Sequence, residues 1–376
     1  MNNNGANSLE IKQMNRNKIY NYIRKNQPVS KRDIVYGLRL SLPTVTQNLE
    51  YLMEQKLIDA SHKIKYTGGR NAIAYTCLEN AKIGIGMDIT GNHVKAVAVD
   101  LLGEVMKVIV KRVKFELTDG YYKKLGEMVR ELIVQVDIDD AQVLGVGIAV
   151  PGLVSEDGEV VTYGLTLDFT GATREEFAKY IPYPNKLFHD SYTAGYAEIR
   201  SEPEMKDAFY ISLSNNVGGS IIMNNKIYFG DSNKSGEIGH MIIQPNGVPC
   251  YCGQRGCFET YCNARELSNE TDGDLEKFFQ LLDAREESIV KVWDQYLDYL
   301  GIAIHNIRLL FDCTVIIGGY VGSYIDNYMD ELLKRIDALH PFSEAATDYI
   351  IPCKYKTEAI AAGAALMYVD AFTKNI

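Results

Sequence analysis

The most specific segment of the chain is GEIGHMIIQPNGVPCYCGQRGCFE, residues 236–259. Within this segment, Cys250, Cys252 and Cys257 lie in a span of eight residues, and His240 lies ten residues upstream of the first cysteine. Three thiolates and one imidazole form the donor set of closed, tetrahedral structural zinc sites. The segment therefore predicts that these four residues hold a structural Zn²⁺.

The remaining cysteines are scattered along the chain: Cys77, Cys262, Cys313 and Cys353. That scatter is typical of buried thiols in a reducing cytoplasm. Cys262 lies only five residues beyond Cys257 and is an alternative zinc ligand. The alternative for the whole group is a set of buried or redox-active thiols without metal, but the spacing and the turn glycines Gly253 and Gly256 favour zinc.

On both sides of this segment, strand patterns alternate with helical ones. Strands are predicted at 83–89, 94–100, 105–113, 143–150, 208–214, 220–230 and 313–320, and helices near 119–136, 285–311 and 357–372. The two halves of this pattern are similar, each combining mixed sheet and helices. The sequence thus predicts an α/β body of two lobes with a cleft between them.

The GEIGH motif followed by CxCGxxGCxE resembles the signature of the ROK family, whose name stands for repressors, open reading frames and kinases. The resemblance covers essentially the whole chain and implies a two-lobed, actin-like, sugar-kinase-type (ribonuclease H-like) body with a zinc knuckle. It divides the chain into a winged helix-turn-helix over residues 1–80, a first lobe over 81–190 and a second, zinc-bearing lobe over 191–356. The terminal helix, 357–376, is expected to pack back on the first lobe.

The same resemblance implies a sugar site. Glu237, His240 and Glu259 match family positions that hold sugar hydroxyls, and His240 also ligates zinc. Asp190 matches the general base of family kinases and is expected here to bind sugar, with His189 beside it. Carboxylates suit this role because each accepts hydrogen bonds from two hydroxyls. The alternative is solvated surface charge for the glutamates and a helix N-cap for Asp190.

Some residues near this site depart from the family pattern. His189 stands where the family commonly has Asn, and the segment VTYGLTLDFTG at 161–171, with Tyr163 and Asp168, replaces an Asn-containing sugar contact. These differences leave xylose, glucose and N-acetylated amino sugars as alternatives, with or without a phosphate.

The expected phosphate-binding turns also differ from those of kinases. Residues 88–92 are DITGN where family kinases have Asp-x-Gly-Gly-Thr, and residues 214–220 are SNNVGGS in place of a glycine-rich loop. Tyr320 replaces a glycine where adenine would bind. Side chains at such positions obstruct the approach of phosphate oxygens to backbone amides. ATP is therefore not an expected cofactor, and the chain is predicted not to be an enzyme. An ATP-dependent sugar kinase with an appended head is the alternative.

The first 80 residues differ in charge from the rest. They hold 12 Lys and Arg against 6 Asp and Glu, a net charge of +6, whereas the whole chain carries −10. A basic head on an acidic body favours a polyanionic partner.

The helical pattern of the head supports that interpretation. Helices are predicted near 13–26, after the capping-box pair Ser30 and Asp33, and from Ser41 to Gln55, followed by an extended pair at 57–61 and 72–76. The predicted DNA contacts lie on the third helix and the hairpin: Thr44, Gln47, Asn48, Tyr51, Lys63, Lys65 and Arg70. The alternative is a three-helix protein-binding module.

Length and composition bound the remaining possibilities. The 376 residues suit two or three domains, and the longest apolar run is too short for a membrane span. No signal peptide is visible, so we expect a cytoplasmic protein without a membrane partner.

The predicted function is a sugar-responsive repressor of a carbohydrate-utilisation operon. It is expected to bind operator DNA as a homodimer or higher oligomer and to be released by a sugar or sugar phosphate. A zinc-stabilised DNA-binding protein without a small ligand is a further alternative.

Overall fold

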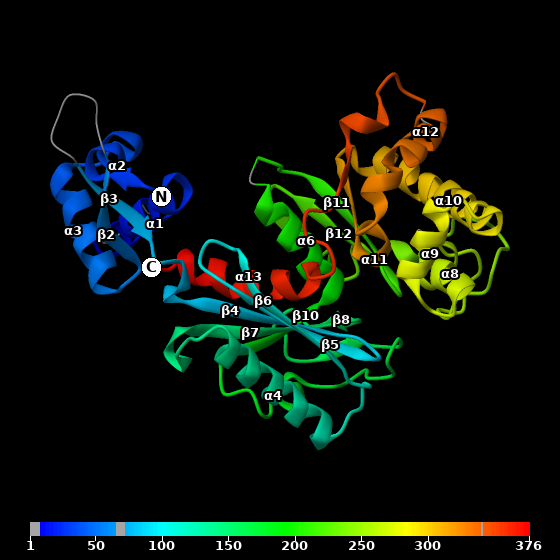
Figure 1. The fold of residues 1–376 in the computed structure, drawn as a ribbon, viewed down its shortest axis with the longest axis horizontal. Coiled ribbons are helices and arrows are strands. Elements are labelled where there is room, and N and C mark those ends of the chain that lie inside the picture. The colour runs from blue at the N-terminus through cyan, green and yellow to red at the C-terminus, as the bar shows by residue number, and fades with distance from the viewer. Residues whose placement is uncertain (1–7, 65–71, 203, 340) are drawn as a thin grey trace, which may run out of the picture.

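The computed structural model describes residues 8–64, 72–202, 204–339 and 341–376 (Figure 1). The N-terminal part, here called the head, combines three helices with a small antiparallel sheet of order β1-β3-β2. Its elements are α1 (Ser8–Asn26), β1 (Val29–Ser30), α2 (Lys31–Leu38), α3 (Leu42–Glu54), β2 (Ile58–Ile64) and β3 (Ala72–Cys77). Lys65 and Arg70 lie outside the described residues, as does the side chain of Lys63.

The starts of α2 and α3 follow from their capping residues. The Asp33 backbone N–H donates to Ser30 Oγ at 3.2 Å, and the Ser30 N–H donates to the Asp33 carboxylate at 2.8 Å. At α3, Ser41 Oγ accepts from the Thr44 N–H at 3.3 Å, and Pro43 occupies the first turn. Both predicted caps are confirmed, because each satisfies amides that have no partner within the helix.

Lobe 1 is built on a five-stranded sheet of order β10-β7-β4-β5-β6, in which β4, β5 and β6 are antiparallel and β7 and β10 run parallel to β4. Its elements are β4 (Ile83–Ile89), β5 (His93–Val99), β6 (Val105–Arg112), α4 (Asp119–Gln135), β7 (Val143–Val150), β8 (Leu153–Val154), β9 (Val161–Tyr163), α5 (Arg174–Phe177) and β10 (Asn185–His189). Helix α4 covers one face and α13 (Ala359–Thr373) the other (Figure 1).

Helix α13 approaches lobe 1 closely because the strands beneath it carry glycines. A Cβ on Gly86 would lie 1.8 Å from the carbonyl oxygen of Ala361, and one on Gly147 would lie 2.5 Å from that of Ala364. The small residues of α13 therefore pack backbone against backbone on β4 and β7. Helix α13 also lies along α6 (Asp190–Ser201), so it joins both lobes.

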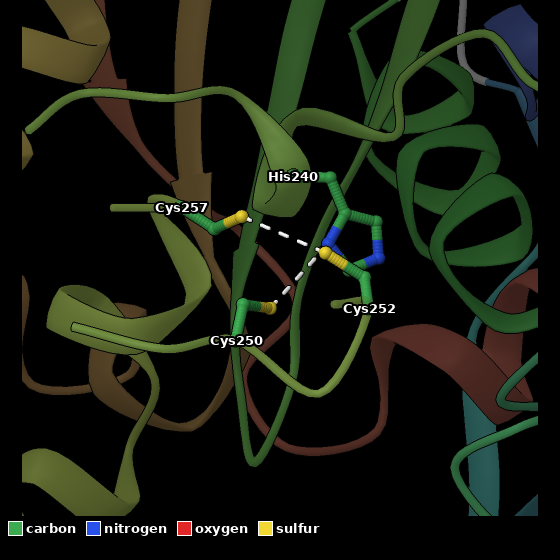
Figure 2. A group of neighbouring side chains, drawn as sticks. All are labelled: His240, Cys250, Cys252 and Cys257. Atoms are coloured by element: carbon green, nitrogen blue, oxygen red, sulfur yellow. Dashed lines mark hydrogen bonds between the residues drawn. The ribbon is translucent and has the colours of Figure 1, made fainter. Parts of the chain in front are cut away.

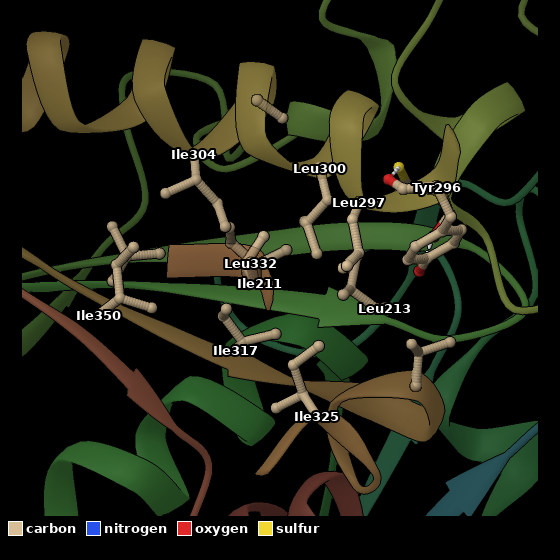
Figure 3. Close-up of a cluster of buried hydrophobic side chains, with 14 of the residues drawn as sticks. Ile211, Leu213, Tyr296, Leu297, Leu300, Ile304, Ile317, Ile325, Leu332 and Ile350 are labelled. Atoms are coloured by element: carbon tan, nitrogen blue, oxygen red, sulfur yellow. Dashed lines mark hydrogen bonds between the residues drawn. The ribbon is translucent and has the colours of Figure 1, made fainter. Parts of the chain in front are cut away.

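Lobe 2 is built on a second sheet, of order β13-β12-β11-β14-β15. Its strands are β11 (Ala208–Leu213), β12 (Val217–Met223), β13 (Lys226–Tyr228), β14 (Thr314–Gly318) and β15 (Ile350–Pro352). Its remaining helices are α7 (Glu259–Cys262), α8 (Arg265–Ser268), α9 (Leu275–Asp283), α10 (Glu287–Phe311), α11 (Gly319–Gly322) and α12 (Met329–Leu339). Figure 3 shows side chains of α10 directed onto Ile211, Leu213 and Ile317. The alternate residues Tyr210 and Ile316 face α6, as expected for strands covered on both sides.

The single strand predicted over 220–230 is wrong. The segment forms a hairpin of β12 and β13, closed by Asn224 and Asn225 with φ of 53° and 59°. Two successive residues with positive φ match the turn that the twist of paired strands favours, and asparagine tolerates this conformation.

The head is joined to the body through a shared apolar core. Ile19, Tyr20 and Ile23 of α1 belong to the same buried cluster as Val369 of α13 and the terminal Ile376. In Figure 1 the C-terminus lies beside the head, at the end of α13. The described helices include none with the length and apolarity of a membrane span.

Candidate functional site

A cavity of about 780 Å³ lies between the two lobes. Its lobe 1 side includes the β4–β5 turn at residues 90–92 and residues 163–167, and its lobe 2 side includes the β11–β12 turn at 214–218. The start of α6 and the segment from Glu237 to His240 also line it. A volume of this size suits a small polar molecule that contacts both lobes.

One end of the cavity carries His189, Asp190 and Glu237, here called the acidic wall. Nε2 of His189 lies 3.5 Å from an Asp190 carboxylate oxygen and 3.7 Å from a Glu237 carboxylate oxygen. Asp190 is the first residue of α6, and its carboxylate accepts from the Ser191 N–H at 2.6 Å. The edge of the His189 ring meets Tyr192, with centroids 4.5 Å apart. One imidazole is thus held between two carboxylates.

Burial changes the proton affinities of this wall. It raises the pKa of Asp190 to about 6, although the Ser191 hydrogen bonds oppose the rise. It raises the pKa of Asp88, at the end of β4, to about 7, against the attraction of Lys95. It also raises the pKa of Glu237 and lowers that of His189, which keeps the imidazole neutral near pH 7.

A group of four metal-type donors lies next to the acidic wall: His240, Cys250, Cys252 and Cys257 (Figure 2). Their ligand atoms all lie within 4.8 Å of one another. His240 Nδ1 is 3.8 Å from Cys250 Sγ, and Cys252 Sγ is 3.7 Å from Cys257 Sγ. Four ligands about 2.3 Å from a central ion stand about 3.8 Å apart in a tetrahedron, so the spacing suits a metal ion.

The donor group also positions a residue of the cavity. Because His240 Nδ1 faces the cysteines, Nε2 is the ring's other polar atom, and His240 lines the cavity together with Tyr251. Cys262, the alternative ligand in the sequence, is not part of the group. It lies in the lobe 2 core with its sulfur 3.7 Å from the Tyr296 carbonyl oxygen.

Glu259 and Asp168 are not among the residues that line the cavity. The Glu259 carboxylate accepts from the backbone N–H of Val217, and burial raises its pKa to about 7. Asp168 is exposed, whereas Tyr163, five residues earlier, lines the cavity. Glu259 therefore stabilises the β11–β12 turn.

The other end of the cavity, here called the turn end, contains the β4–β5 and β11–β12 turns. Thr90, Ser214 and Asn216 line this end of the cavity at positions where family kinases have glycine. Tyr320 also lines the cavity, and its N–H donates to Ser214 Oγ at 3.3 Å. The structure thus brings these altered positions together around one space.

The four predicted contacts on α3 differ in exposure. Gln47 is exposed and Thr44 is half-buried. The expectation that Asn48 lies on the exposed face is wrong, because this residue is only 6% exposed and its amide donates to the Thr44 carbonyl at 2.8 Å. Tyr51 is half-buried under the Arg16 guanidinium, which lies 3.4 Å from the ring centroid.

Two groups of residues were missed in the sequence. Lys95 is buried beside Asp88, and its ammonium donates to the Thr357 carbonyl. Both carboxylate oxygens of Asp370 in α13 accept from the Arg200 Nε–H at 2.9 Å, and one of them also accepts from the Tyr196 hydroxyl at 2.5 Å. The available signal was a lone charge within an otherwise apolar strand or helix, which is costly unless it is paired.

The two sheets, the cavity between them and the donor group define a two-lobed α/β protein with a cleft between its lobes. The model of the ROK family matches residues 84–371, and the chain belongs to this family. The sequence is similar to the xylose repressor of Bacillus subtilis, at 24% identity over 83% of each chain. It is also similar to the N-acetylmannosamine kinase of Vibrio vulnificus, at 29% identity over 52% of this chain and 70% of the kinase. The fold is that of a ROK transcriptional regulator homologous to E. coli MLC, with a TM-score of 0.75, 22% identity and 97% coverage of both chains.

Proposed function

We propose that this protein is a sugar-responsive repressor that binds operator DNA through its head and releases it when a sugar occupies the cleft. The observation that carries this proposal is the connection between the two sites: α6 and α13 both begin at the cleft, α13 ends in the core shared with the head, and Arg200 near the end of α6 is paired with Asp370 of α13. The similarity to the xylose repressor supports the same function. A repressor requires such a connection, since an effector acts only by binding one conformation better than another.

The first part of the connection is α6. It starts at Asp190 in the acidic wall and, about 15 Å further along its axis, carries Arg200, which binds Asp370 of α13. Arg24 of the head lies close enough to Arg200 and Asp370 for both to affect its pKa, and its guanidinium donates to the Leu101 carbonyl at 3.3 Å. Movement of Asp190 on sugar binding therefore changes a charged contact of the head.

The second part is α13. Thr357 and Ile360 line the cleft at its start, whereas Val369 lies in the core shared with the head. Its close packing on the glycines of β4 and β7 makes it move as a rigid body with lobe 1. When a bound sugar closes the lobes, this helix carries the head with it. The two heads of a dimer then no longer match the spacing of the two half-sites on the operator.

We assign the head as a winged helix-turn-helix, with α3 in the major groove and the β2–β3 hairpin as the wing. Gln47, exposed in the N-terminal half of α3, is the principal base-contacting candidate. Asn48 instead fixes α3 by its bond to Thr44. The net charge of +6 on residues 1–80 supports contact with phosphates.

The assignment of α3 is tested by Gln47→Ala, with Gln55→Ala at the end of the same helix as the matched control. Gln47→Ala is expected to weaken binding to the cognate operator by about 1–3 kcal/mol and to leave non-specific binding unchanged. Fluorescence anisotropy at fixed salt measures both. Equal sequence preference in the two variants would place the base-reading surface elsewhere.

We assign the four-donor group as a structural zinc site. The closed His/Cys₃ donor set and its spacing support this, and a bound ion would fix His240 as a sugar-contacting residue. Zn²⁺ supplies no chemistry to the cleft in this role. It holds residues 240–257 in place beside the acidic wall.

Kinase activity is the second candidate, favoured by Asp190, which stands at the base position, and by the similarity to an N-acetylmannosamine kinase. We propose that it is absent, because Thr90, Ser214 and Asn216 at the turn end stand where family kinases have glycine, and their side chains hinder the approach of ATP phosphates to the backbone. Sugar-dependent ADP release across hexoses, pentoses and amino sugars tests this directly. Turnover above about 1 s⁻¹, within the ordinary range for kinases, would establish the enzyme.

The repressor function is tested by anisotropy on a labelled DNA fragment from upstream of the protein's own gene, titrated with a panel of sugars. We expect binding in the nanomolar range that one sugar reverses. Tight binding that no sugar alters would support only the head, and no binding to DNA of any sequence would refute the proposal.

A further inference from the structure

The cleft has more room than one sugar ring needs, and the inference drawn from this rests on the proposed function. A pyranose has about 12 non-hydrogen atoms. Even at the roughly 30 Å³ that each water molecule occupies in the liquid, these atoms would fill less than half of the cavity of about 780 Å³. One ring at the acidic wall therefore leaves space for a second group.

Part of that space is bordered by large apolar side chains that are exposed. Tyr163, Leu165 and Tyr251, here called the rim, line the cavity and are 44%, 50% and 53% exposed. Apolar side chains that stay exposed beside a cavity are typical of a surface that a ligand covers. Covering them is favourable because it removes apolar area from water.

The rim lies on the acidic-wall side of the cleft. His189 ends β10 beside the end of β7, and β8, which follows β7 after two residues, pairs with Tyr163. On the lobe 2 side, the Tyr251 ring packs edge-on against the His240 ring, with centroids 5.3 Å apart. A group at the rim would therefore adjoin a sugar ring at the acidic wall and contact both lobes.

The lobe 1 part of the rim, Tyr163 and Leu165, is held in an anchored loop. Gly164, which separates these two residues, accepts from the Phe169 N–H at 3.0 Å and donates its own N–H to Thr170 Oγ1 at 2.9 Å. Phe169 is buried in the lobe 1 core. The two exposed side chains are thus fixed beside the cavity before a ligand binds, which lowers the entropy cost of binding.

The rim and the acidic wall suit different parts of a carbohydrate. A pyranose has hydroxyl groups around its edge and C–H groups on its faces. The carboxylates of the wall accept hydrogen bonds from hydroxyls, whereas tyrosine rings and a leucine side chain pack against C–H groups. Two adjoining surfaces of these kinds match two linked sugar rings.

We propose that the rim is a second sugar subsite, and that the effector is a disaccharide or a longer oligosaccharide. One ring lies at the acidic wall, and the next ring packs between Tyr163 and Leu165 of lobe 1 and Tyr251 of lobe 2. Because the second ring contacts both lobes, it adds to the binding free energy that favours their closed arrangement.

The test is calorimetric titration of the full metal-loaded chain with matched pairs of ligands. The pairs are xylose and xylobiose, glucose and cellobiose, glucose and maltose, and N-acetylglucosamine and diacetylchitobiose. We expect one disaccharide to bind about 10–100-fold more tightly than its monosaccharide, the factor expected when about 100 Å² of apolar rim surface is buried.

Variants of the rim link this difference to the second subsite. Tyr163→Ala and Leu165→Ala each remove an exposed side chain, so the fold is expected to be retained, and the ratio of the two affinities is expected to fall about fivefold or more. The matched control, Tyr228→Ala, changes a comparably exposed tyrosine of β13 that does not line the cavity, and it is expected to leave the ratio unchanged.

Monosaccharides that bind at least as tightly as their disaccharides in every pair would overturn the inference and leave the sugar-responsive function intact. Failure of both members of every pair to bind would refute that function, and the inference with it. A preserved ratio in both Tyr163→Ala and Leu165→Ala would overturn the assignment of the second ring to the rim.

Discussion

The two ends of the cleft are built differently. At the acidic wall, two carboxylates flank one imidazole at 3.5 and 3.7 Å, and the four-donor group lies beside them. At the turn end, two hairpin turns carry asparagine and serine side chains, and Tyr320 lines the same cavity, with its N–H bonded to Ser214 Oγ. The first end is organised to hold a ligand of defined geometry, and the second has side chains where phosphoryl transfer needs glycine. This difference supports our proposal that the cleft binds a ligand without phosphorylating it.

The largest effect is expected from loss of the metal site. Cys252→Ser removes one of four donors, and we expect loss of the bound metal with a decrease of at least about 3 kcal/mol in the free energy of unfolding, or roughly 6–12 °C in Tm. The control is Cys262→Ala, a buried cysteine outside the group, which is expected to retain one equivalent of zinc. Elemental analysis and calorimetry measure both. A Cys252→Ser variant that lost its metal but kept full stability would show that the acidic wall does not depend on a bound metal.

The next effect concerns the acidic wall itself. Asp190→Asn replaces the carboxylate that we propose accepts from sugar hydroxyls, and we expect sugar binding to weaken about 10–100-fold with DNA binding unchanged. Asp168→Asn is the matched control, the same change at an exposed site outside the cavity. Calorimetry measures the first quantity and anisotropy the second. Normal sugar binding by Asp190→Asn would show that the sugar does not bind at this wall.

A smaller effect, the pH dependence of sugar affinity, distinguishes the acidic wall from the turn end of the cleft. The pKa of Asp190 is raised to about 6, so lowering the pH from 8 to 5 protonates the carboxylate. If sugar hydroxyls donate to the ionised carboxylate, as we propose, sugar affinity is expected to rise with pH through 6 and to level off above 7, with about a tenfold loss at pH 5. Metal content is measured in parallel.

The Asp190→Asn variant is the control for this titration and is expected to lose most of the pH dependence. An affinity of the unaltered protein that stays constant from pH 5 to 8 would exclude Asp190 as the titrating contact.

The smallest effect is expected at the turn end. Asn215→Ala removes an exposed side chain from the β11–β12 turn, and we expect sugar affinity and sugar-driven DNA release to change less than about twofold. The two quantities are measured as for Asp190→Asn. A loss of tenfold or more would show that this end also binds the effector.

Much of the fold could be predicted because its signals are local. The Ser30 and Ser41 caps, the buried strands of lobe 1 and the spacing of the metal-type donors each depend on residues close together in sequence. The β12–β13 hairpin was also marked locally, by Asn224 and Asn225, but the apolar residues on both sides were taken as one strand.

The side-chain directions were less predictable. Asn48 lies three residues after Val45 and four before Leu52, so it falls on the buried side of α3 despite its polar side chain. Glu259 binds the Val217 amide, a partner 42 residues away, and the Asp370 contact to Arg200 spans 170 residues. Such pairings depend on how the lobes pack, which no local pattern specifies.

The central claim is that sugar and operator binding are coupled through α6 and α13. The most direct test is to titrate the effector sugar calorimetrically into the free protein and into its complex with operator DNA. Linkage requires that operator weaken sugar binding by the same factor by which sugar weakens operator binding, and we expect a factor of about 5–150 for each. Equal sugar affinity in the free protein and in the DNA complex would contradict the account.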